Sequence, residues 1–447
     1  MSRTVIIGAN HAGIAAANTL LDNYKDQEVV MIDRNSNLSY LGCGTALWVG
    51  RQIDDYHGLF YTSEEEFAKK GADIHMQTEV SHIDFDKKVV YAHPLDGKED
   101  FEVSYDHLLL TTGSRPISPN VPGKDLDGIH FLKLFQEGQA VDKELAKEDV
   151  NTVAVIGAGY IGVEVAEAAK RRGKKVLLFD AAKTCLANYY DPEFSSLMEE
   201  NLKEHGLELH FGELVSEYKG DANGRVNQVV TKDGNSFDVD MVINAIGFGP
   251  NNVLGKDHLE LFANGAYKVD KHQQTSDPAV YAAGDCATIY SNAADADTYI
   301  ALASNAVRSG ILAGHNIGGT PLEAIGVQGS NGISIFGLNL VSTGLSVQSA
   351  PKFGIEVQYS DFEDLQKPGF MKNNDKVKIR LVYEKSSRRL VGAQLASKAD
   401  ISMAVHMFSL AIQEHVTIDK LSLLDIFFLP HFNQPYNYIT MAALNAK

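Results

Sequence analysis

The sequence has very few cysteines, and Cys43, Cys185 and Cys286 are the only three among its 447 residues. They lie far apart, and none belongs to a CxxC or CxxxxC pair. The spacing therefore predicts neither a disulfide framework nor a zinc site, and no metal site is expected. A cysteine that takes part in chemistry here has no partner cysteine near it in the sequence.

Basic residues are also scarce, with 40 Lys and Arg against 58 Asp and Glu and a formal net charge of -18. This charge disfavours binding to nucleic acids or to anionic membrane surfaces. No apolar run approaches the roughly 20 residues of a membrane span, and the apolar residues 5–7 are too few for a signal peptide. We therefore expect a cytoplasmic protein, and its length predicts two to four folded domains.

The N-terminal segment has the pattern of a dinucleotide-binding turn. An apolar strand over residues 4–8 leads into Gly-Ala-Asn-His-Ala-Gly at 8–13 and then into a helix of small residues. A second strand, residues 28–32, ends in Asp33, where an acid can bond a ribose hydroxyl. Asn10 replaces the middle glycine of GxGxxG, so the backbone would approach a pyrophosphate less freely. A strand-turn-helix unit without a nucleotide is the alternative.

The same pattern recurs in complete form later in the chain. A strand over residues 152–156 leads into Gly-Ala-Gly-Tyr-Ile-Gly at 157–162, and the next strand, residues 176–179, ends in Asp180. The three glycines allow the turn, the approach of a pyrophosphate and close packing of helix on strand. Asp180 would bond a free ribose 2′-hydroxyl and repel a 2′-phosphate, and no arginine follows within ten residues. The unit therefore predicts NADH rather than NADPH.

Further apolar strands end in glycine at residues 108–113 and 241–247, and the run 275–285 ends in Gly-Asp. Asp285 would thus stand at the carboxyl end of a strand, where open α/β sheets bind ligands. A solvated acid without a ligand is the alternative. A helix is predicted to follow over residues 299–313.

The pattern changes from about residue 326, and the remainder predicts a compact α+β module. Its expected elements are strands at 333–336, 377–383 and 390–395 and a helix at 402–413. The tail over residues 426–432 is very apolar, which indicates burial against a partner or ordinary packing within the module.

Cys43 lies between Gly42 and Gly44 at the head of an apolar run. The glycines would let the backbone approach a flat ligand, and a helix beginning just after them would stabilise a thiolate through its N-terminal amides. The alternative is that Cys43 is a small buried hydrophobic residue.

The order of these motifs resembles that of the pyridine nucleotide-disulfide reductase family over essentially the whole chain. Ser-Tyr-Leu-Gly-Cys-Gly at 39–44, His11 and Gly-Tyr-Ile-Gly at 159–162 resemble its single-cysteine branch of NADH oxidases, NADH peroxidases and coenzyme A disulfide reductases. Within the branch, Leu-Gly-Cys-Gly-Thr-Ala-Leu at 41–47 is most similar to the water-forming NADH oxidases of lactic acid bacteria.

The resemblance implies an α/β fold with two Rossmann-like dinucleotide-binding domains and a C-terminal α+β dimerisation domain. The implied boundaries are residues 1–120 and 245–322 for a split FAD-binding domain, 121–244 for the NAD-binding domain and 323–447 for the module that forms a homodimer.

The resemblance also assigns cofactor contacts. Those implied for FAD are Gly8, Ala9, Asn10, His11, Ala12 and Asp33 at the pyrophosphate and adenosine, Thr111, Thr112, Gly113 and Ser114 along the cofactor, Asp285 at the ribityl chain, Ala301, Leu302 and Ala303 at the pyrimidine edge, and Cys43, Val80 and Lys133. Those implied for NADH are Gly157, Gly159, Ile161 and Gly162 at the pyrophosphate, Asp180 at the ribose, Tyr189 on the adenosine side, Glu164 near the nicotinamide, Tyr160 as a cover of the flavin, and Gly247. The loop at 246–251 lacks an arginine that the family often has, so no contact is predicted there beyond Gly247.

The implied activity is a flavin-dependent NADH oxidase with dioxygen as substrate. Peroxide formed beside Cys43 would be reduced to water by the thiolate, which becomes a sulfenic acid that a second NADH reduces. His11 would orient the peroxide or move its proton, and a phosphate-loop histidine without chemistry is the alternative. An NADH peroxidase, a coenzyme A disulfide reductase and a redox sensor that binds FAD and NADH without turnover stay open.

Overall fold

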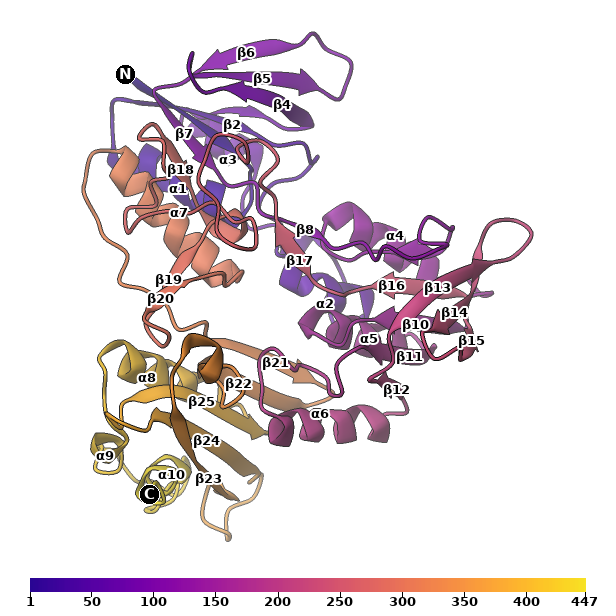
Figure 1. Ribbon diagram of the computed structural model, residues 1–447, viewed down its shortest axis with the longest axis vertical. Helices are drawn as coiled ribbons and strands as arrows, with labels where there is room; N and C mark the ends of the chain where they lie inside the picture. Colours follow the sequence, from indigo (N-terminus) through magenta and orange to yellow (C-terminus); the bar gives the residue numbers. More distant parts are fainter.

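The computed structural model describes residues 1–447, which form three lobes, each built on a five-stranded sheet (Figure 1). The first sheet is parallel throughout, and its strands are short apolar runs that suit a sheet covered on both faces. Its strands in spatial order are β18 (Val280–Ala282), β7 (His107–Leu110), β1 (Ser2–Ile7), β2 (Gln27–Ile32) and β3 (Asp73–His75).

The second sheet repeats this parallel arrangement, with β10 and β11 in the places of β1 and β2. Its strands in spatial order are β9 (Ile129–His130), β16 (Met241–Asn244), β10 (Thr152–Ile156), β11 (Lys175–Asp180) and β12 (Glu208–Phe211). The outermost strand β9 precedes β10 in the chain, whereas β18 comes long after β1. The chain therefore contains two parallel five-stranded sheets of the same arrangement, whose strands are connected in a different order along the chain.

Helices cover both parallel sheets. On the first sheet, α1 (His11–Asn23) and α7 (Ala303–Ile317) lie side by side (Figure 1). A Cβ atom at Gly310 would lie 2.2 Å from the Ala12 carbonyl oxygen, so glycine permits this close approach. The other helices of these two lobes are α2 (Thr45–Val49), α3 (Glu64–Lys69), α4 (Phe135–Leu145), α5 (Tyr160–Arg171) and α6 (Pro192–Glu204), with 3-10 turns η1 (Gly42–Gly44), η2 (His57–Leu59) and η3 (Gly284–Cys286).

Each parallel unit also carries a three-stranded antiparallel sheet before its β7 or β16 strand. The chain passes between the two lobes through an antiparallel pair, β8 (Ser114–Pro116) with β17 (Phe248–Pro250) (Figure 1). The remaining strands are β4 (Thr78–Asp84), β5 (Val89–Pro94) and β6 (Phe101–Ser104) in one small sheet, β13 (Val215–Gly220), β14 (Val226–Thr231) and β15 (Ser236–Asp238) in the other, and the pair β19 (Ile289–Ser291) with β20 (Ala296–Thr298).

The C-terminal lobe is an antiparallel sheet covered by helices. Its strands in spatial order are β21 (Asn331–Ile335), β22 (Leu338–Gly344), β25 (Leu390–Ser397), β24 (Lys376–Glu384) and β23 (Val357–Leu365), and the helices are η4 (Ala350–Phe353), α8 (Ser402–Gln413), α9 (Ile418–Leu421) and α10 (Tyr438–Leu444). Of the apolar tail, Ile426 packs against the core of this lobe, whereas Phe427 and Phe432 are 66% and 56% exposed.

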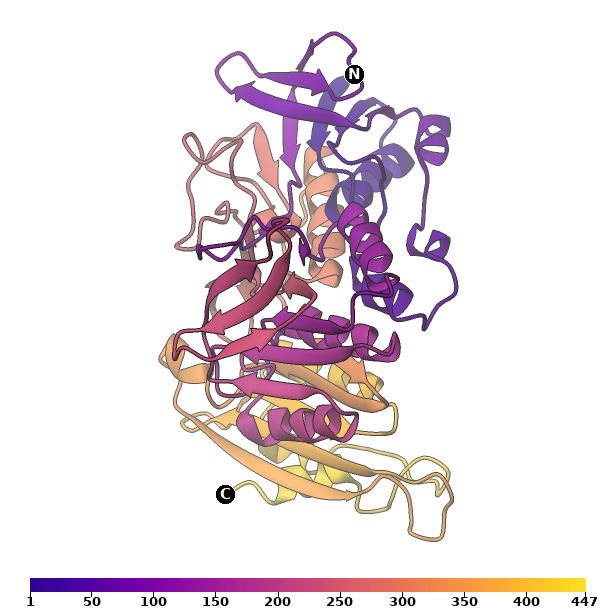
Figure 2. The ribbon, with the colours of Figure 1, turned by 90° about the vertical axis from the view of Figure 1, so that its right-hand side faces the viewer.

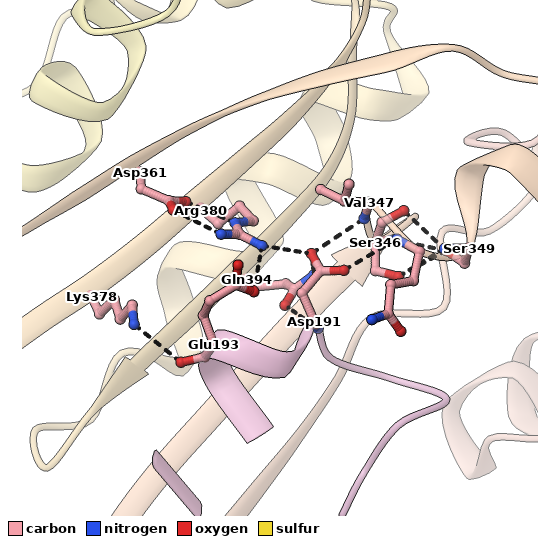
Figure 3. A network of polar contacts seen from close by, with 10 residues as sticks. Asp191, Glu193, Ser346, Val347, Ser349, Asp361, Lys378, Arg380 and Gln394 are labelled. Carbon is pink, nitrogen blue, oxygen red and sulfur yellow. Dashed lines mark hydrogen bonds and ion pairs between the residues drawn. The ribbon is translucent and has the colours of Figure 1, made fainter. Parts of the chain in front are cut away.

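The second lobe lies against the C-terminal lobe (Figure 2), and an ionic network around the buried Arg380 and Asp191 side chains joins the two (Figure 3). Arg380 of β24 binds Asp361 with two hydrogen bonds of 2.8 and 2.7 Å and lies 2.9 Å from Glu193 and 3.3 Å from Asp191. Asp191, just before α6, also accepts hydrogen bonds from Gln394 and from the backbone after β22. These contacts hold α6 against the sheet.

The expected α/β architecture and C-terminal module are confirmed, and the predicted strands at 152–156 and helix at 402–413 have the predicted bounds. The helix predicted at 299–313 is wrong at its start, since α7 begins at Ala303. The preceding residues continue from β20, and Leu302 has extended backbone angles, φ -137° and ψ 140°. No helix is long and apolar enough to cross a membrane.

Candidate active site

The first glycine turn joins β1 to α1. Gly8 has φ +114°, which L side chains rarely adopt. The Asp33 carboxylate at the end of β2 accepts hydrogen bonds from the backbone N–H groups of Ala9 (2.7 Å) and Asn35 (2.8 Å). Burial raises the pKa of Asp33, although these hydrogen bonds oppose the shift. The exposed Asn10 side chain makes no capping bond to α1.

The second glycine turn, between β10 and α5, has the same construction. Gly157 has φ +102°, and Asp180 accepts hydrogen bonds from the N–H groups of Ala158 (2.6 Å) and Ala182 (2.7 Å). No atom lies within 4 Å of a Cβ built at Gly159, so the middle glycine faces open space. That space at a helix N-terminus fits a dinucleotide pyrophosphate.

Asp285 lies in η3, directly after β18. Ser114 Oγ donates a hydrogen bond to Asp285 Oδ2 at 2.7 Å, and Lys133 Nζ lies 3.5 Å from the same oxygen and 4.3 Å from the centroid of the Phe248 ring. The buried Tyr299 hydroxyl makes no hydrogen bond of standard geometry, and burial raises the pKa of Tyr299. An unpaired buried hydroxyl beside Asp285 fits a polar ligand such as a ribityl chain.

Cys43 lies in η1, just before α2, and its side chain is exposed, whereas Cys185 and Cys286 are buried. Although it is exposed, the protein atoms around it desolvate the thiolate, and with the negative charge of Glu164 they raise the pKa of Cys43. Lys133 opposes this shift. The backbone N–H at Cys43 does favour the thiolate, as expected, but burial and Glu164 outweigh it, so the net stabilisation expected from the helix terminus is not found. The helix does begin at Thr45, but α2 has only five residues, and desolvation and negative charge dominate.

A group of aromatic and acidic residues lies around the start of α5. Tyr160 stacks on Tyr189 with ring centroids 4.3 Å apart, and its hydroxyl lies 2.9 Å from the Tyr190 hydroxyl and donates to Asn331 Oδ1 of β21. Burial, together with the negative charge of Glu167, raises the pKa of Glu164 to about 7. Glu164 is thus a carboxyl group that changes charge near neutral pH.

The other residues for which cofactor contacts are predicted lie on several different elements. The Thr111 hydroxyl donates to the carbonyl groups of Ile7 and Gly8, so this side chain closes the first glycine turn. The Thr112 hydroxyl donates to the Asn251 carbonyl group. Ala301 and Leu302 precede α7 and Ala303 begins it, Gly247 precedes β17, Gly113 precedes β8, and Val80 lies on β4 against the core of the first lobe. The contacts of these residues with cofactors stay predictions.

The structure also adds residues that the sequence reasoning missed. Tyr61 stacks on His11, and Tyr299 and Phe248 lie beside Asp285 and Lys133. No local motif marks these aromatic residues, because each reaches the site from a segment distant in sequence.

Residues 2–310 match the family model for pyridine nucleotide-disulphide oxidoreductases, and residues 332–437 match the model for their dimerisation domain. The chain belongs to the pyridine nucleotide-disulphide oxidoreductase family. The expected family is thereby confirmed, and this chain is an oxidoreductase.

Relatives of this oxidoreductase match it from end to end. The NADH oxidase of Lactococcus lactis subsp. cremoris is 66% identical over 447 residues, which cover 100% of both chains. The NADH oxidase of Streptococcus pyogenes is 54% identical over 460 aligned residues and also covers 100% of both. The structure of the water-forming NADH oxidase from Lactobacillus brevis bound to NADH has a TM-score of 0.96 at 36% identity, covering 99% of this chain and 98% of that chain.

Proposed function

We propose that this oxidoreductase is a flavin-dependent NADH oxidase that reduces dioxygen to water, with Cys43 alternating between thiol and sulfenic acid. The observation that carries the proposal is the position of Cys43. It is the one exposed cysteine, and it lies within the electrostatic reach of Glu164 and Lys133 from the second lobe and of Asp285 from the first. The end-to-end similarity to NADH oxidases supports it.

The cofactors are FAD and NADH, and the two glycine turns fit them. We propose that the turn at Gly8, with Asp33, Asp285 and Ser114, holds FAD, and that the turn at Gly157 with Asp180 holds NADH. When bound, FAD accepts a hydride from NADH and supplies its electrons to dioxygen.

The proposed role of Cys43 is to reduce the peroxide that the first two electrons produce. Its sulfur attacks one peroxide oxygen, so an S–O bond forms and the O–O bond breaks. The thiol proton ends on the departing oxygen, which leaves as water. Two electrons and two protons from a second NADH and the solvent then return the sulfenic acid to a thiol and release a second water. No second cysteine is needed, which agrees with the burial of Cys185 and Cys286.

We further propose the division into residues 1–120 and 245–322 for FAD, 121–244 for NAD and 323–447 for dimerisation. The exposed tail residues Phe427 and Phe432 support a homodimer, because the single chain leaves them in solvent. A cytoplasmic location agrees with the lack of any helix that could cross a membrane.

Cys43→Ser tests the proposed chemistry. The wild-type protein should consume two NADH per dioxygen, and the variant should consume one and release hydrogen peroxide, because the second reduction needs the sulfur. An oxygen electrode, NADH absorbance and a peroxide assay give these ratios, and Cys185→Ala, which alters a buried thiol, is the control. Unchanged water formation by Cys43→Ser would exclude the proposal.

The same assays separate the alternatives. An NADH peroxidase would oxidise NADH only when peroxide is added, and a coenzyme A disulfide reductase only with that disulfide. A redox sensor would bind both cofactors but consume no NADH in air.

A further inference from the structure

His11 has a close aromatic partner in Tyr61. The Tyr61 hydroxyl lies 3.0 Å from His11 Nδ1, and the two rings are stacked, with centroids 5.8 Å apart and an angle of 7° between their planes. The other ring nitrogen, Nε2, makes no hydrogen bond within the protein. Because each nitrogen of a neutral imidazole has a distinct role, the bond at Nδ1 decides what Nε2 can do.

Tyr61 is fixed to the loop that carries Cys43. The segment 59–62 runs antiparallel to the loop at 39–41, through the Leu41 N–H to Leu59 carbonyl bond of 2.8 Å and the Tyr40–Phe60 bridge. Ser39 completes this connection, because its hydroxyl accepts hydrogen bonds of 3.2 Å from the N–H groups of Tyr61 and Thr62.

Ser39 also links this loop to the first glycine turn. Its N–H donates to the Ala9 carbonyl group at 3.1 Å, two residues before His11. Ser39 is fully buried and has φ +60°, a strained conformation for a residue other than glycine. Such strain persists only where the surroundings impose it. Ser39 therefore holds three pieces in one arrangement: the turn with His11, the Tyr61 segment and the Cys43 loop.

The charge states of His11 and Tyr61 limit which of the two side chains can donate the hydrogen bond between them. Burial lowers the pKa of His11, with Asp285 opposing, and burial raises the pKa of Tyr61 to about 12. At neutral pH the imidazole is thus neutral and the phenol keeps its proton. Within the protein, His11 Nδ1 is the only hydrogen-bond partner of the Tyr61 hydroxyl, and a phenol that donates to Nδ1 leaves the imidazole proton on Nε2.

We propose that Tyr61 is a positioning residue that holds His11 in the Nε2–H tautomer, so that His11 donates a hydrogen bond to the departing oxygen of the peroxide that Cys43 reduces. The inference rests on the proposed function. Ser39 ties the Cys43 loop to the turn that carries His11, and the charge of Asp285 acts on both side chains. Without Tyr61 the imidazole can place its proton on Nδ1, and Nε2 then presents a lone pair to the peroxide.

Tyr61→Phe tests this, because it keeps the ring and removes the hydroxyl. Tyr61 is 45% exposed, so the variant should fold. We expect about three- to tenfold slower reduction of peroxide, the loss typical of one hydrogen bond, and a matching rise in hydrogen peroxide released per NADH. Tyr91→Phe is the matched control, since Tyr91 stacks on His82 with centroids 4.0 Å apart but has no hydrogen bond to it.

A second measurement needs no turnover. In FAD-loaded protein labelled with ¹⁵N-histidine, the two-bond ¹H–¹⁵N spectrum distinguishes the tautomers, and His11→Gln identifies the His11 signals. We expect Nε2–H in the wild type and a shift towards Nδ1–H in Tyr61→Phe. A wild-type Nδ1–H tautomer, or a variant with unchanged tautomer and peroxide release, would overturn the inference.

Different results would contradict the proposed function and the proposed role of Tyr61. If Cys43→Ser releases no peroxide, the proposed function is wrong whatever the tautomer. If Cys43→Ser releases peroxide while Tyr61→Phe behaves as wild type, only the role of Tyr61 is wrong.

Discussion

The protonation of the Cys43 thiol depends on charged residues from three other segments of the chain. Burial raises its pKa most, Glu164 of α5 and Asp285 of η3 raise it further, and Lys133 lowers it. The isolation of Cys43 between two glycines makes it a candidate from the sequence alone. Its charged neighbours are not predictable in this way, because only the folded chain brings them together. For the same reason the sequence suggests a stabilised thiolate where the structure shows a raised pKa.

Glu164→Gln tests this electrostatic setting. The pKa of Glu164 is about 7, so below pH 7 the wild-type residue is neutral and resembles glutamine, and above pH 7 its charge disfavours the Cys43 thiolate. We expect the alkylation rates of reduced wild-type and variant protein to coincide near pH 6, and the variant to react faster as the pH rises above 7. Iodoacetamide reports Cys43 because the other two cysteines are buried.

The control for this experiment is Glu65→Gln, which removes a carboxylate that is 78% exposed on α3. It should leave the alkylation rate unchanged at every pH. Parallel pH profiles for wild type and Glu164→Gln would show that Glu164 does not act on Cys43.

At the scale of elements, the strands of the two parallel sheets can be predicted, because short stretches of sequence are enough to indicate them. The strands β1, β2, β10 and β11 are apolar runs that lead directly to glycine or an acid, and β10 has the predicted bounds. The start of α7 is not predictable in this way, because small apolar residues such as Ala301 fit either a helix or an extended strand end. Packing against α1 and the continuation of β20 decide between them.

Gly159→Asn would give the second glycine turn the residue that the first has at Asn10. The backbone is extended at both positions, with ψ -169° and -159°, and a Cβ atom at residue 159 would meet no other protein atom within 4 Å. We expect an unchanged melting temperature and about a tenfold rise in the KM for NADH, on the order of 1.4 kcal/mol, because the side chain would occupy the space proposed for the pyrophosphate.

Steady-state kinetics and calorimetry measure these two quantities. Asn10→Gly is the reciprocal control and should leave the KM for NADH unchanged, because it alters the other turn. A lower melting temperature with an unchanged KM would mean that Gly159 serves the fold rather than the nucleotide.

At the scale of the whole molecule, the contacts that fix the lobes are the least predictable. Asp191 precedes Pro192 at the start of α6, a pattern typical of a helix N-cap. Its carboxylate makes no capping bond to α6 and instead binds groups of the C-terminal lobe, including Arg380 and Gln394. The residues that bind Asp191 lie far along the chain, so no local pattern indicates them.

Arg380→Met tests how strongly this network joins the lobes. The Arg380 side chain is 3% exposed and that of Asp191 1%, so the variant leaves a buried carboxylate without its cation. We expect a loss of about 3–5 kcal/mol in stability, measured by urea unfolding. The control Arg388→Met breaks an exposed pair with Asp419 and should cost at most about 1 kcal/mol. Equal losses would show that burial adds nothing to the Arg380 network. Because Asp191 directly follows Tyr189 and Tyr190, the Arg380 variant alone should also raise the KM for NADH.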